Sequence, residues 1–192
     1  NNLPLIHVEA GLRSFNKKMP EELNRILTDH CSSLLFCPSE SSIENLKKEG
    51  IVHREGKCSS DAPGVYLCGD VMYDNSLYFS EKVKEGLADY LVQNNYILFT
   101  LHRPSNTDDP DRLKAIYVSL IEFAEKFEKR IVFPIHPRTK KAMMHVLTEG
   151  EWDSLRNHKF INVTDPVSFH EMISLEKNCE LIITDSGGVQ KE

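Results

Sequence analysis

The sequence predicts an α/β protein built on mostly parallel sheets. Short apolar runs alternate along the chain with longer segments of helical periodicity, and this alternation is typical of βαβ units. Several of the apolar runs end in polar or charged residues, as expected of strands whose carboxyl ends meet at one edge of a sheet. No internal repeat or low-complexity tract interrupts the pattern.

The composition narrows the class of protein. Of the 192 residues, 40% are apolar and 27% are charged, as in ordinary globular proteins with one good core or two small domains. The net charge of −6, with no basic block to offset it, argues against broad nucleic-acid binding. The longest apolar runs, such as residues 131–135, are far too short to cross a bilayer. We therefore expect neither a nucleic-acid partner nor a membrane partner.

The cysteines are scattered, and no two of them form a C-x-x-C pair. An odd, scattered set favours reduced thiols in a cytoplasmic protein over a disulfide framework. The same spacing rule makes a cysteine metal site a weak hypothesis, so we expect no metal and no cofactor. The five residues are Cys31, Cys37, Cys58, Cys68 and Cys179.

The first predicted strand is Leu3–Val8, and Glu9 follows it directly. Pro20 is expected to open a helix, because proline is favoured at the first helical position and Glu21 and Glu22 suit the positive end of the helix dipole. Four residues then recur at helical spacing, namely Leu23, Ile26, Leu27 and His30. A second strand is predicted at Leu34–Cys37.

Ser39 or Ser41 is expected to cap the next helix. Residues 53–63 are polar and contain turn formers, which predicts a loop. A strand at Val65–Leu67 and a helix that follows Asp70–Asp74 complete this part of the chain. We place a domain boundary here, between residues 73 and 74.

A fresh set of units begins beyond this boundary. Short runs rich in β-branched and aromatic residues predict strands at Tyr96–Thr100, Arg130–Ile135, Phe160–Val163 and Leu181–Thr184. Thr107–Pro110 is a strong helix start, and the helix after it carries an apolar stripe at Leu113, Ile116, Tyr117, Leu120, Phe123 and Phe127. Further helices are expected from Thr139 to about Thr148 and from Pro166 onward.

The two ends of the sequence predict an internal piece of a longer protein. The strand at residue 3 has no partner strand before it, and the chain stops four residues after Gly187-Gly188, which is expected to open a helix. We therefore expect the fold to be incomplete at both ends.

Asp185-Ser186-Gly187-Gly188 follows the last predicted strand. Two glycines between a strand and a helix allow close approach of the backbone, and a helix N-terminus presents free N–H groups to an anion such as phosphate. Ser186 could add a hydroxyl. An ordinary tight turn between strand and helix explains the glycines equally well, because a Gly-Gly pair alone is a weak signal.

His102 and Arg103 follow the strand at Tyr96–Thr100. Arginine keeps its proton and suits diphosphate oxygens, and histidine can donate to a phosphate or carry a proton near neutral pH. The strand-end position favours a functional role for His102 over a loop histidine bonded only to the backbone. His136 and Arg138 repeat the theme one strand along, although His136 lies between Ile135 and Pro137 and could instead fix the turn.

Glu9 and Glu21 supply negative charge near one strand end and the helix start after it. Arg13 lies between them in the sequence and is expected to keep Glu9 or Glu21 ionised. Two carboxylates opposite two basic loops would make an acid/base site opposite a phosphate site. A simple match to the helix dipole would suffice for one of Glu21 and Glu22.

Five motifs occur in order along the chain: "HVEAGLRS", "MPEELNRILTDH", "HRPSN", "PIHPRT" and "TDSGGVQKE". In this order and spacing they resemble the non-hydrolysing UDP-N-acetylglucosamine 2-epimerase family of bacterial surface-polysaccharide synthesis, and the match runs over nearly the whole chain. The stretch "RSFNKKMPEELNRILTDH" is similar to a branch that acts on UDP-2,3-diacetamido-uronic acids in lipopolysaccharide pathways.

The resemblance implies a GT-B fold, in which two Rossmann-like domains bind a nucleotide sugar in the cleft between them. Residues 1–73 would then be the C-terminal part of the first domain, and residues 74–192 most of the second, UDP-binding domain. The family's first βα units and last helices lie outside this sequence. We therefore expect the parent enzyme to be active and this fragment alone to be inactive. Family members are often dimers, so the resemblance also allows a homodimer.

The resemblance further implies inversion at C2 of the sugar, through anti elimination of UDP and its re-addition to a glycal-type intermediate. By motif, Glu9 and Glu21 are the expected catalytic acid/base groups near C1–C2. His102 is the expected catalytic histidine near the diphosphate, with Arg13 and Arg103 as supporting charges.

The remaining motif positions are expected to bind the substrate. Ser186, Gly187 and Gly188 would cradle the diphosphate, and Glu192 would hold the ribose hydroxyls. The full substrate-binding set is Arg13, Arg103, Asn106, His136, Arg138, Ser186, Gly187, Gly188 and Glu192.

Other functions share the same nucleotide cradle. They are, in order of preference after the epimerase, a hydrolysing epimerase, a GT-B glycosyltransferase and a UDP-sugar-binding module without turnover. The sequence also leaves the substrate open between a plain UDP-N-acetylhexosamine and a diacetamido-uronate analogue.

Overall fold

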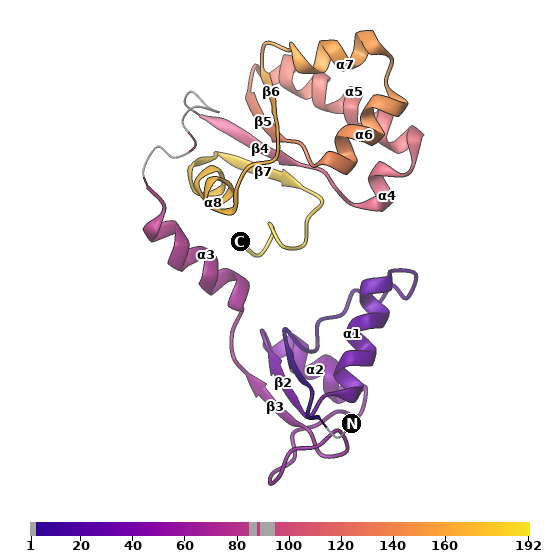
Figure 1. Ribbon diagram of the computed structural model, residues 1–192, viewed down its shortest axis with the longest axis vertical. Coiled ribbons are helices and arrows are strands. Elements are labelled where there is room, and N and C mark those ends of the chain that lie inside the picture. Colours follow the sequence, from indigo (N-terminus) through magenta and orange to yellow (C-terminus); the bar gives the residue numbers. More distant parts are fainter. Residues whose placement is uncertain (1–2, 85–87, 89–94) are drawn as a thin grey trace. The chain divides into compact units, whose positions relative to one another are not determined.

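The computed structural model describes residues 3–84, 88 and 95–192. The chain divides into two compact units, unit 1 at Asn1–Asp74 and unit 2 at Asn75–Glu192, each with its own parallel sheet (Figure 1). The division falls one residue beyond the boundary that the sequence predicts. One helix, α3 (Val71–Lys82), runs across it.

Unit 1 holds a three-stranded sheet among its described residues, in the order β1-β2-β3. The central strand, β2 (Leu34–Cys37), pairs in parallel with β1 (Ile6–Val8) and with β3 (Gly64–Leu67). The connections carry α1 (Pro20–Cys31) and α2 (Glu40–Lys48). Its small buried core is contributed by Ala10, Leu35, Cys37, Leu46 and Ile51.

Unit 2 holds a four-stranded parallel sheet among its described residues, in the order β6-β5-β4-β7. The strands are β4 (Tyr96–Thr100), β5 (Arg130–Pro134), β6 (Ile161–Thr164) and β7 (Leu181–Thr184). Along the chain, β5 pairs with one edge of β4, β6 is added next to β5, and β7 then pairs with the opposite edge of β4. The loops after β4 and β7 therefore leave the sheet at a topological switch point, the usual place for a ligand in open α/β sheets.

Helices line the sheet of unit 2 (Figure 1). They are α4 (Pro104–Thr107), α5 (Pro110–Phe127), α6 (Pro137–Val146), α7 (Glu149–Arg156) and α8 (Phe169–Asn178). The main buried core lies between the sheet and α5 to α7, where the rings of Phe99 and Phe133 meet edge to face at a centroid distance of 4.7 Å. This core fixes the strand ends from which the polar loops leave.

The strongest local signals are confirmed. The strands at Leu34–Cys37, Tyr96–Thr100 and Leu181–Thr184 have the predicted bounds. Pro20 is the first residue of α1, and Ser39 rather than Ser41 caps α2 by accepting a hydrogen bond from the Ser42 N–H at 3.3 Å.

Several helix starts differ from the prediction. A helix does not begin at Pro166, because Ser168 and Glu171 form a capping box that sets the start of α8 at Phe169. The capping box of Thr148 and Glu151 likewise begins α7, which the sequence reading missed. The short helix α4 was also not expected, and α6 begins at Pro137 rather than Thr139.

The first strand is shorter than predicted. Only Ile6–Val8 of the predicted strand Leu3–Val8 is paired.

Residues 187–191, which include the Gly-Gly pair, form turns. Within them the Gln190 N–H donates to the Ser186 carbonyl and the Glu192 N–H to the Gly188 carbonyl, with the four-residue spacing of an α-helix. The helix expected to open at this point stays a prediction.

The buried face of α1 is acidic. The predicted apolar positions Leu23 and Leu27 are 43% and 63% exposed, whereas Glu22 and Asp29 are each 1% exposed. These two carboxylates lie seven residues apart, on one side of the helix. The helix therefore brings negative charge, and not an apolar stripe, into unit 1.

Gly11 offers a direct test of the packing between β1 and α2. Its φ is +77°, and an added Cβ would lie 2.3 Å from the Ser42 carbonyl oxygen. Gly50 has a similar φ of +83°, but a Cβ there would meet nothing within 4 Å. We predict that Gly11→Ala lowers the free energy of unfolding by roughly 3 kcal/mol, since overpacking adds to the left-handed strain. Gly50→Ala should lower it by only about 1 kcal/mol, from strain alone.

Urea unfolding of the full-length variants, followed by circular dichroism, checks this prediction. Equal losses in the two variants would contradict the clash with Ser42.

Candidate functional site

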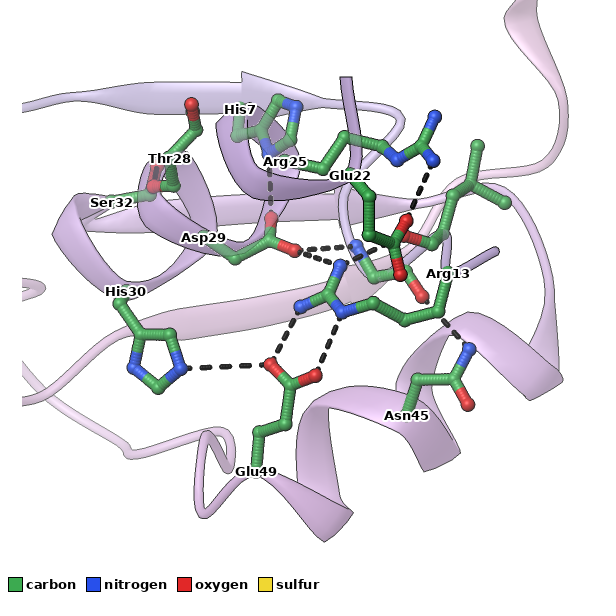
Figure 2. A network of polar contacts seen from close by, with 12 residues as sticks. His7, Arg13, Glu22, Arg25, Thr28, Asp29, His30, Ser32, Asn45 and Glu49 are labelled. Atoms are coloured by element: carbon green, nitrogen blue, oxygen red, sulfur yellow. Dashed lines mark hydrogen bonds and ion pairs between the residues drawn. The ribbon is translucent and has the colours of Figure 1, made fainter. Parts of the chain in front are cut away.

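Asp29 is the centre of a buried polar network in unit 1 (Figure 2). Its carboxylate accepts hydrogen bonds from His7 Nδ1 at 2.5 Å, from the Gly11 N–H at 3.1 Å and from Arg13 Nη1 at 2.7 Å. The three donors come from β1 and the loop after it, whereas Asp29 lies in α1. One side chain therefore ties the strand-end loop to the helix.

Arg13 is the cation of this network. Its Nε and Nη2 donate to the two carboxylate oxygens of Glu49, each at 2.7 Å, and its Nη1 also donates to the Leu12 carbonyl. The guanidinium is 1% exposed. Its hydrogen bonds to Glu49 and Asp29 raise the pKa of Arg13 despite burial. The hydrogen bond between Arg13 and Glu49 also lowers the pKa of Glu49.

The predicted partner of Arg13 was therefore wrong. Arg13 pairs with Asp29 and Glu49, and not with Glu9 or Glu21. Its hydrogen bonds to protein acceptors occupy four of the five guanidinium N–H groups. This geometry favours a role in holding the loop over direct contact with a substrate.

The acidic pair at the start of α1 divides into one structural and one exposed residue. Glu22 accepts the backbone N–H groups of Ser14 and Phe15 at 2.9 and 2.8 Å and a hydrogen bond from Arg25 Nη2 at 2.7 Å. Burial opposes ionisation, but these hydrogen bonds outweigh it and lower the pKa of Glu22 to about 2. Glu21 is exposed in the first turn, where it matches the helix dipole.

Glu9 has an unusual backbone conformation. It follows β1 with a φ of 69°, in the left-handed region that side chains larger than glycine rarely adopt. The residues beside it are held firmly, since Ala10 N–H donates to the Phe36 carbonyl at 3.0 Å and Asn45 Nδ2 to the Gly11 carbonyl at 3.0 Å. Backbone strain of this kind is often found at functional sites, because the surroundings have to impose it.

In unit 2, Asp185 is the centre of a hydrogen-bond network, as Asp29 is in unit 1. It follows β7, and its carboxylate accepts the backbone N–H groups of His102 and Arg103 and the side-chain amide of Asn106. His102 Nδ1 lies 3.1 Å from the same carboxylate. The loop after β4 is thereby fixed to the loop after β7. Asp185 was not among the predicted site residues, although its place directly after a strand was a usable signal.

A pocket of about 230 Å³ opens beside these loops in unit 2. Its polar lining includes the predicted residues His102, His136 and Ser186, and its apolar lining includes Pro166, Val167 and Met172. A mostly apolar pocket with a few convergent polar groups is the usual form of a small-molecule site.

Arg103 and Gly187 lie against each other at this edge of the sheet. A Cβ on Gly187 would lie 3.3 Å from Arg103 Nη2, so glycine gives the guanidinium room to approach the backbone. The Ser186 hydroxyl accepts the Val189 N–H at 3.3 Å. The predicted residues Arg103, Ser186 and Gly187 are thus brought together.

The second basic loop follows the alternative that the sequence left open for His136. His136 is the N-cap of α6, and its own Nδ1 accepts the Arg138 N–H at 3.2 Å, so it fixes the turn. Arg138 forms an exposed ion pair with Asp108 at 2.7 Å. His136 still lines the pocket, but Arg138 is engaged with a surface carboxylate.

Glu192, the predicted ribose ligand, lies near enough to Glu176 of α8 to act on its charge. Glu176 Oε1 is buried and has no hydrogen-bond partner among the described residues. Burial, and after it the nearby Glu192 carboxylate, raises the pKa of Glu176 to about 8. The protonated form of Glu176 is therefore favoured beside the turn at 187–191.

Within the described ranges, no group of three or more His, Cys, Asp or Glu side chains could hold a metal ion. In the same part of the chain, no helix is long and apolar enough to cross a membrane.

A family model described as UDP-N-acetylglucosamine 2-epimerase matches residues 1–192. The chain belongs to the UDP-N-acetylglucosamine 2-epimerase family. The resemblance read from the five motifs is therefore confirmed.

Two curated members of the family show how close the match is. The chain is 42% identical over 196 residues to a UDP-N-acetylglucosamine 2-epimerase of Methanocaldococcus jannaschii, covering 99% of this chain and 50% of that protein. It is 44% identical over 193 residues to the UDP-2,3-diacetamido-2,3-dideoxy-D-glucuronate 2-epimerase of Pseudomonas aeruginosa, covering 100% of this chain and 49% of that protein. The chain thus spans about half the length of the curated relatives it matches.

Solved structures of the family agree with the fold. The M. jannaschii enzyme in complex with UDP-GlcNAc and UDP aligns with a TM-score of 0.84 and 43% identity, covering 97% of this chain and 49% of that chain. The Neisseria meningitidis enzyme bound to UDP-GlcNAc aligns with a TM-score of 0.80 and 30% identity, covering 98% of this chain and 50% of that chain. The predicted α/β class of GT-B type is confirmed.

The buried Glu22 predicts a stability effect that depends on pH. Its pKa is lower in the folded state than its ordinary value of about 4.5, so its stabilising effect is complete above pH 4.5 and disappears as the pH falls through about 2. We expect Glu22→Gln to lower the free energy of unfolding at pH 7 by roughly 1–3 kcal/mol. The exposed neighbour Glu21 provides a control. Glu21→Gln should change the free energy of unfolding by less than about 0.5 kcal/mol.

Urea unfolding of the full-length variants between pH 7 and pH 2 measures how the free energy of unfolding depends on pH. A wild-type advantage over Glu22→Gln that stays constant down to pH 2 would contradict the assignment.

Glu176 predicts the opposite pH dependence. Because its pKa rises to about 8 on folding, the folded state holds a proton that the unfolded state loses above about pH 4.5. The free energy of unfolding should therefore fall as the pH rises from about 4.5 through 8, by on the order of 1–2 kcal/mol after allowing for solvent screening.

Glu176→Gln should flatten this slope, whereas Glu149→Gln, at an exposed position of α7, should leave it as in the wild type. Thermal unfolding of full-length protein at several pH values is the measurement. An unchanged slope in Glu176→Gln would contradict the raised pKa of Glu176.

Proposed function

We propose that the protein containing this chain inverts C2 of a UDP-N-acetylhexosamine by eliminating UDP and adding it back. Family membership supports this function, and the observation that carries it is the pocket in unit 2. His102 and Ser186 line this pocket, and Arg103 lies against Gly187 in the adjoining residues, at the carboxyl ends of β4 and β7, where open α/β sheets bind ligands.

The chemistry needs a base for a weakly acidic proton. A carboxylate removes the proton from C2, the electrons of that bond form a C1=C2 double bond, and the C1–O bond breaks as UDP leaves with its electron pair. UDP then adds back to C1 while a proton is delivered to the opposite face of C2. Glu9 and Glu21 are the proposed acid/base groups. The strained backbone of Glu9 supports its role.

Departure of UDP leaves negative charge on its diphosphate. Arg103, the N–H groups of the turn at 186–188 and His102 are the proposed groups that stabilise this charge. The pocket contributed by His136, Val167 and Met172 gives the rest of the nucleotide an apolar surface. Glu192 is proposed to hold the ribose hydroxyls, with the buried Glu176 as its neighbour.

The substrate is proposed at the level of UDP-N-acetylhexosamines. Relatives named for UDP-N-acetylglucosamine and for a UDP-diacetamido-glucuronate are 42% and 44% identical to this chain. Sequence identity alone therefore does not distinguish between these two substrates. A cytoplasmic location, a homodimer and a role in surface-polysaccharide synthesis stay predictions that accompany this proposal.

Deuterium exchange at C2 tests the proposal. Full-length protein is incubated in heavy water with each member of a small panel of UDP-sugars and no acceptor, and the sugar is analysed by NMR. We expect deuterium at C2 and both epimers at equilibrium. Glu9→Gln and Glu21→Gln should each slow exchange by at least roughly 100-fold. Glu40→Gln, in the first turn of α2, should leave it unchanged.

The alternatives give different products in the same experiment. A hydrolysing epimerase would release free UDP and the 2-epimer sugar, a glycosyltransferase would show no exchange without an acceptor, and a binding module would bind UDP without exchange. Full exchange in Glu9→Gln or in Glu21→Gln would remove that residue from the acid/base role.

A further inference from the structure

Asp29 contacts the chain on both sides of Glu9. His7, two residues before Glu9, shares a hydrogen bond of 2.5 Å between its Nδ1 and Asp29 Oδ1 (Figure 2). Gly11, two residues after Glu9, donates its backbone N–H to Asp29 Oδ2 at 3.1 Å. The segment 7–11 is therefore held at both ends by one side chain, with Glu9 at its centre.

The backbone of this segment turns at Glu9. β1 ends at Val8, and the turn after it contains two residues with positive φ, Glu9 at 69° and Gly11 at 77°. Glycine adopts such angles freely, whereas in glutamate they bring Cβ too close to the following carbonyl oxygen. Glu9 therefore keeps this conformation because the contacts around it impose it.

Two other hydrogen bonds reach the segment after Glu9, from the Ala10 N–H to the Phe36 carbonyl and from Asn45 Nδ2 to the Gly11 carbonyl. Asp29 differs from these partners because its side chain contacts the segment both before and after Glu9. A single substitution at Asp29 can therefore release both ends.

Asp29 itself is fixed and enclosed. Its side chain is 0% exposed, so it can act on Glu9 only through the chain and cannot touch a bound molecule. Its Oδ2 also accepts a hydrogen bond from Arg13 Nη1 at 2.7 Å, and Arg13 is held in turn by both carboxylate oxygens of Glu49. The carboxylate therefore fixes the segment 7–11 relative to α1.

The direction of the Glu9 side chain follows from its backbone, because a change in φ rotates Cβ about the N–Cα bond. We propose that Asp29 is a positioning residue that holds Glu9 in the left-handed conformation and so directs its carboxylate toward the proton on C2. This inference rests on the proposed function. Misplacement of a catalytic group by about 1 Å can slow a reaction on the order of 100-fold, so release of the segment should affect the chemical step.

Two substitutions separate the hydrogen bonds of Asp29 from its charge. Asp29→Ala removes both contacts with the segment. In Asp29→Asn the amide oxygen can accept the Gly11 N–H, and the NH₂ group can donate to His7 Nδ1, which can be the acceptor in a neutral ring. Asparagine therefore keeps both ends of the segment in place without the charge.

Kinetics of the full-length protein with a UDP-sugar provide the first readout. Asp29→Ala should lower kcat by roughly 100-fold and change KM by less than about threefold, whereas Asp29→Asn should stay within about fivefold of the wild-type kcat. Asp153→Ala, at an exposed position of α7, is the matched control and should leave both constants unchanged. A kcat in Asp29→Asn as low as in Asp29→Ala would overturn the positioning role.

A double mutant separates positioning from a general loss of structure. If Asp29 acts through Glu9, adding Asp29→Ala to Glu9→Gln should slow C2 exchange by less than about threefold, because the carboxylate to be positioned is already gone. A structural defect would slow exchange by the same factor in both backgrounds, and this result would overturn the inference.

Crystal structures of the full-length wild type and Asp29→Ala provide a readout that needs no turnover. We expect residue 9 to have a positive φ in the wild type and to leave the left-handed region in the variant. An unchanged φ would overturn the inference. If no UDP-sugar is epimerised, the proposed function fails, while the two structures still decide whether Asp29 holds the backbone of Glu9.

His7→Phe replaces Asp29→Ala if that variant does not fold, because it removes one of the two contacts and keeps a ring of similar size. It should lower kcat by roughly 10-fold in the wild-type background and by less than about twofold in Glu9→Gln. Equal factors in the two backgrounds would again overturn the inference.

Discussion

A buried carboxylate has to be surrounded by donors, and this constraint organises the strand-end loops of both units. Transfer of an unpaired charge out of water is unfavourable by many kcal/mol, so the surrounding chain has to supply N–H groups in fixed positions. Asp29 gathers donors from β1 and the loop after it, and Asp185 gathers them from the loop after β4. In each unit one aspartate therefore determines the path of a loop that carries candidate site residues.

The two aspartates leave different chemistry available. Around Asp29 the cation is fully engaged, because Arg13 directs its guanidinium to two carboxylates and a carbonyl at almost no exposure. Around Asp185 the network opens onto a pocket, since His102, whose backbone N–H donates to Asp185, also lines the pocket. The first network is best understood as support for the Glu9 loop, and the second as part of a binding surface.

Local patterns predicted most of the fold, and tertiary contacts account for the errors. Apolar runs and proline positions located β2, β4, β7 and the start of α1, because these signals act over a few residues. Two capping boxes, at Thr148 and Ser168, are local signals in the sequence that predict the starts of α7 and α8.

The apolar residues of α1 predicted the wrong buried face for that helix. The buried face is acidic, as the seven-residue spacing of Glu22 and Asp29 indicates. Motif resemblance brought out Glu9, His102 and Arg103, whereas the partners of Arg13 depend on contacts across 16 and 36 residues that no local pattern records.

The pairing of β7 with β4 has a consequence for how the protein is made. Leu181 pairs with Ile97, and the contact between Arg103 and Asp185 spans 82 residues. Closing so long a loop is entropically unfavourable and slows folding relative to local contacts. During synthesis β4, β5 and β6 can pair before β7 leaves the ribosome, but the loop after β4 has no carboxylate to order it until then. The hydrogen bonds that fix the loop beside the pocket of unit 2 therefore form only after β7 and Asp185 have been synthesised.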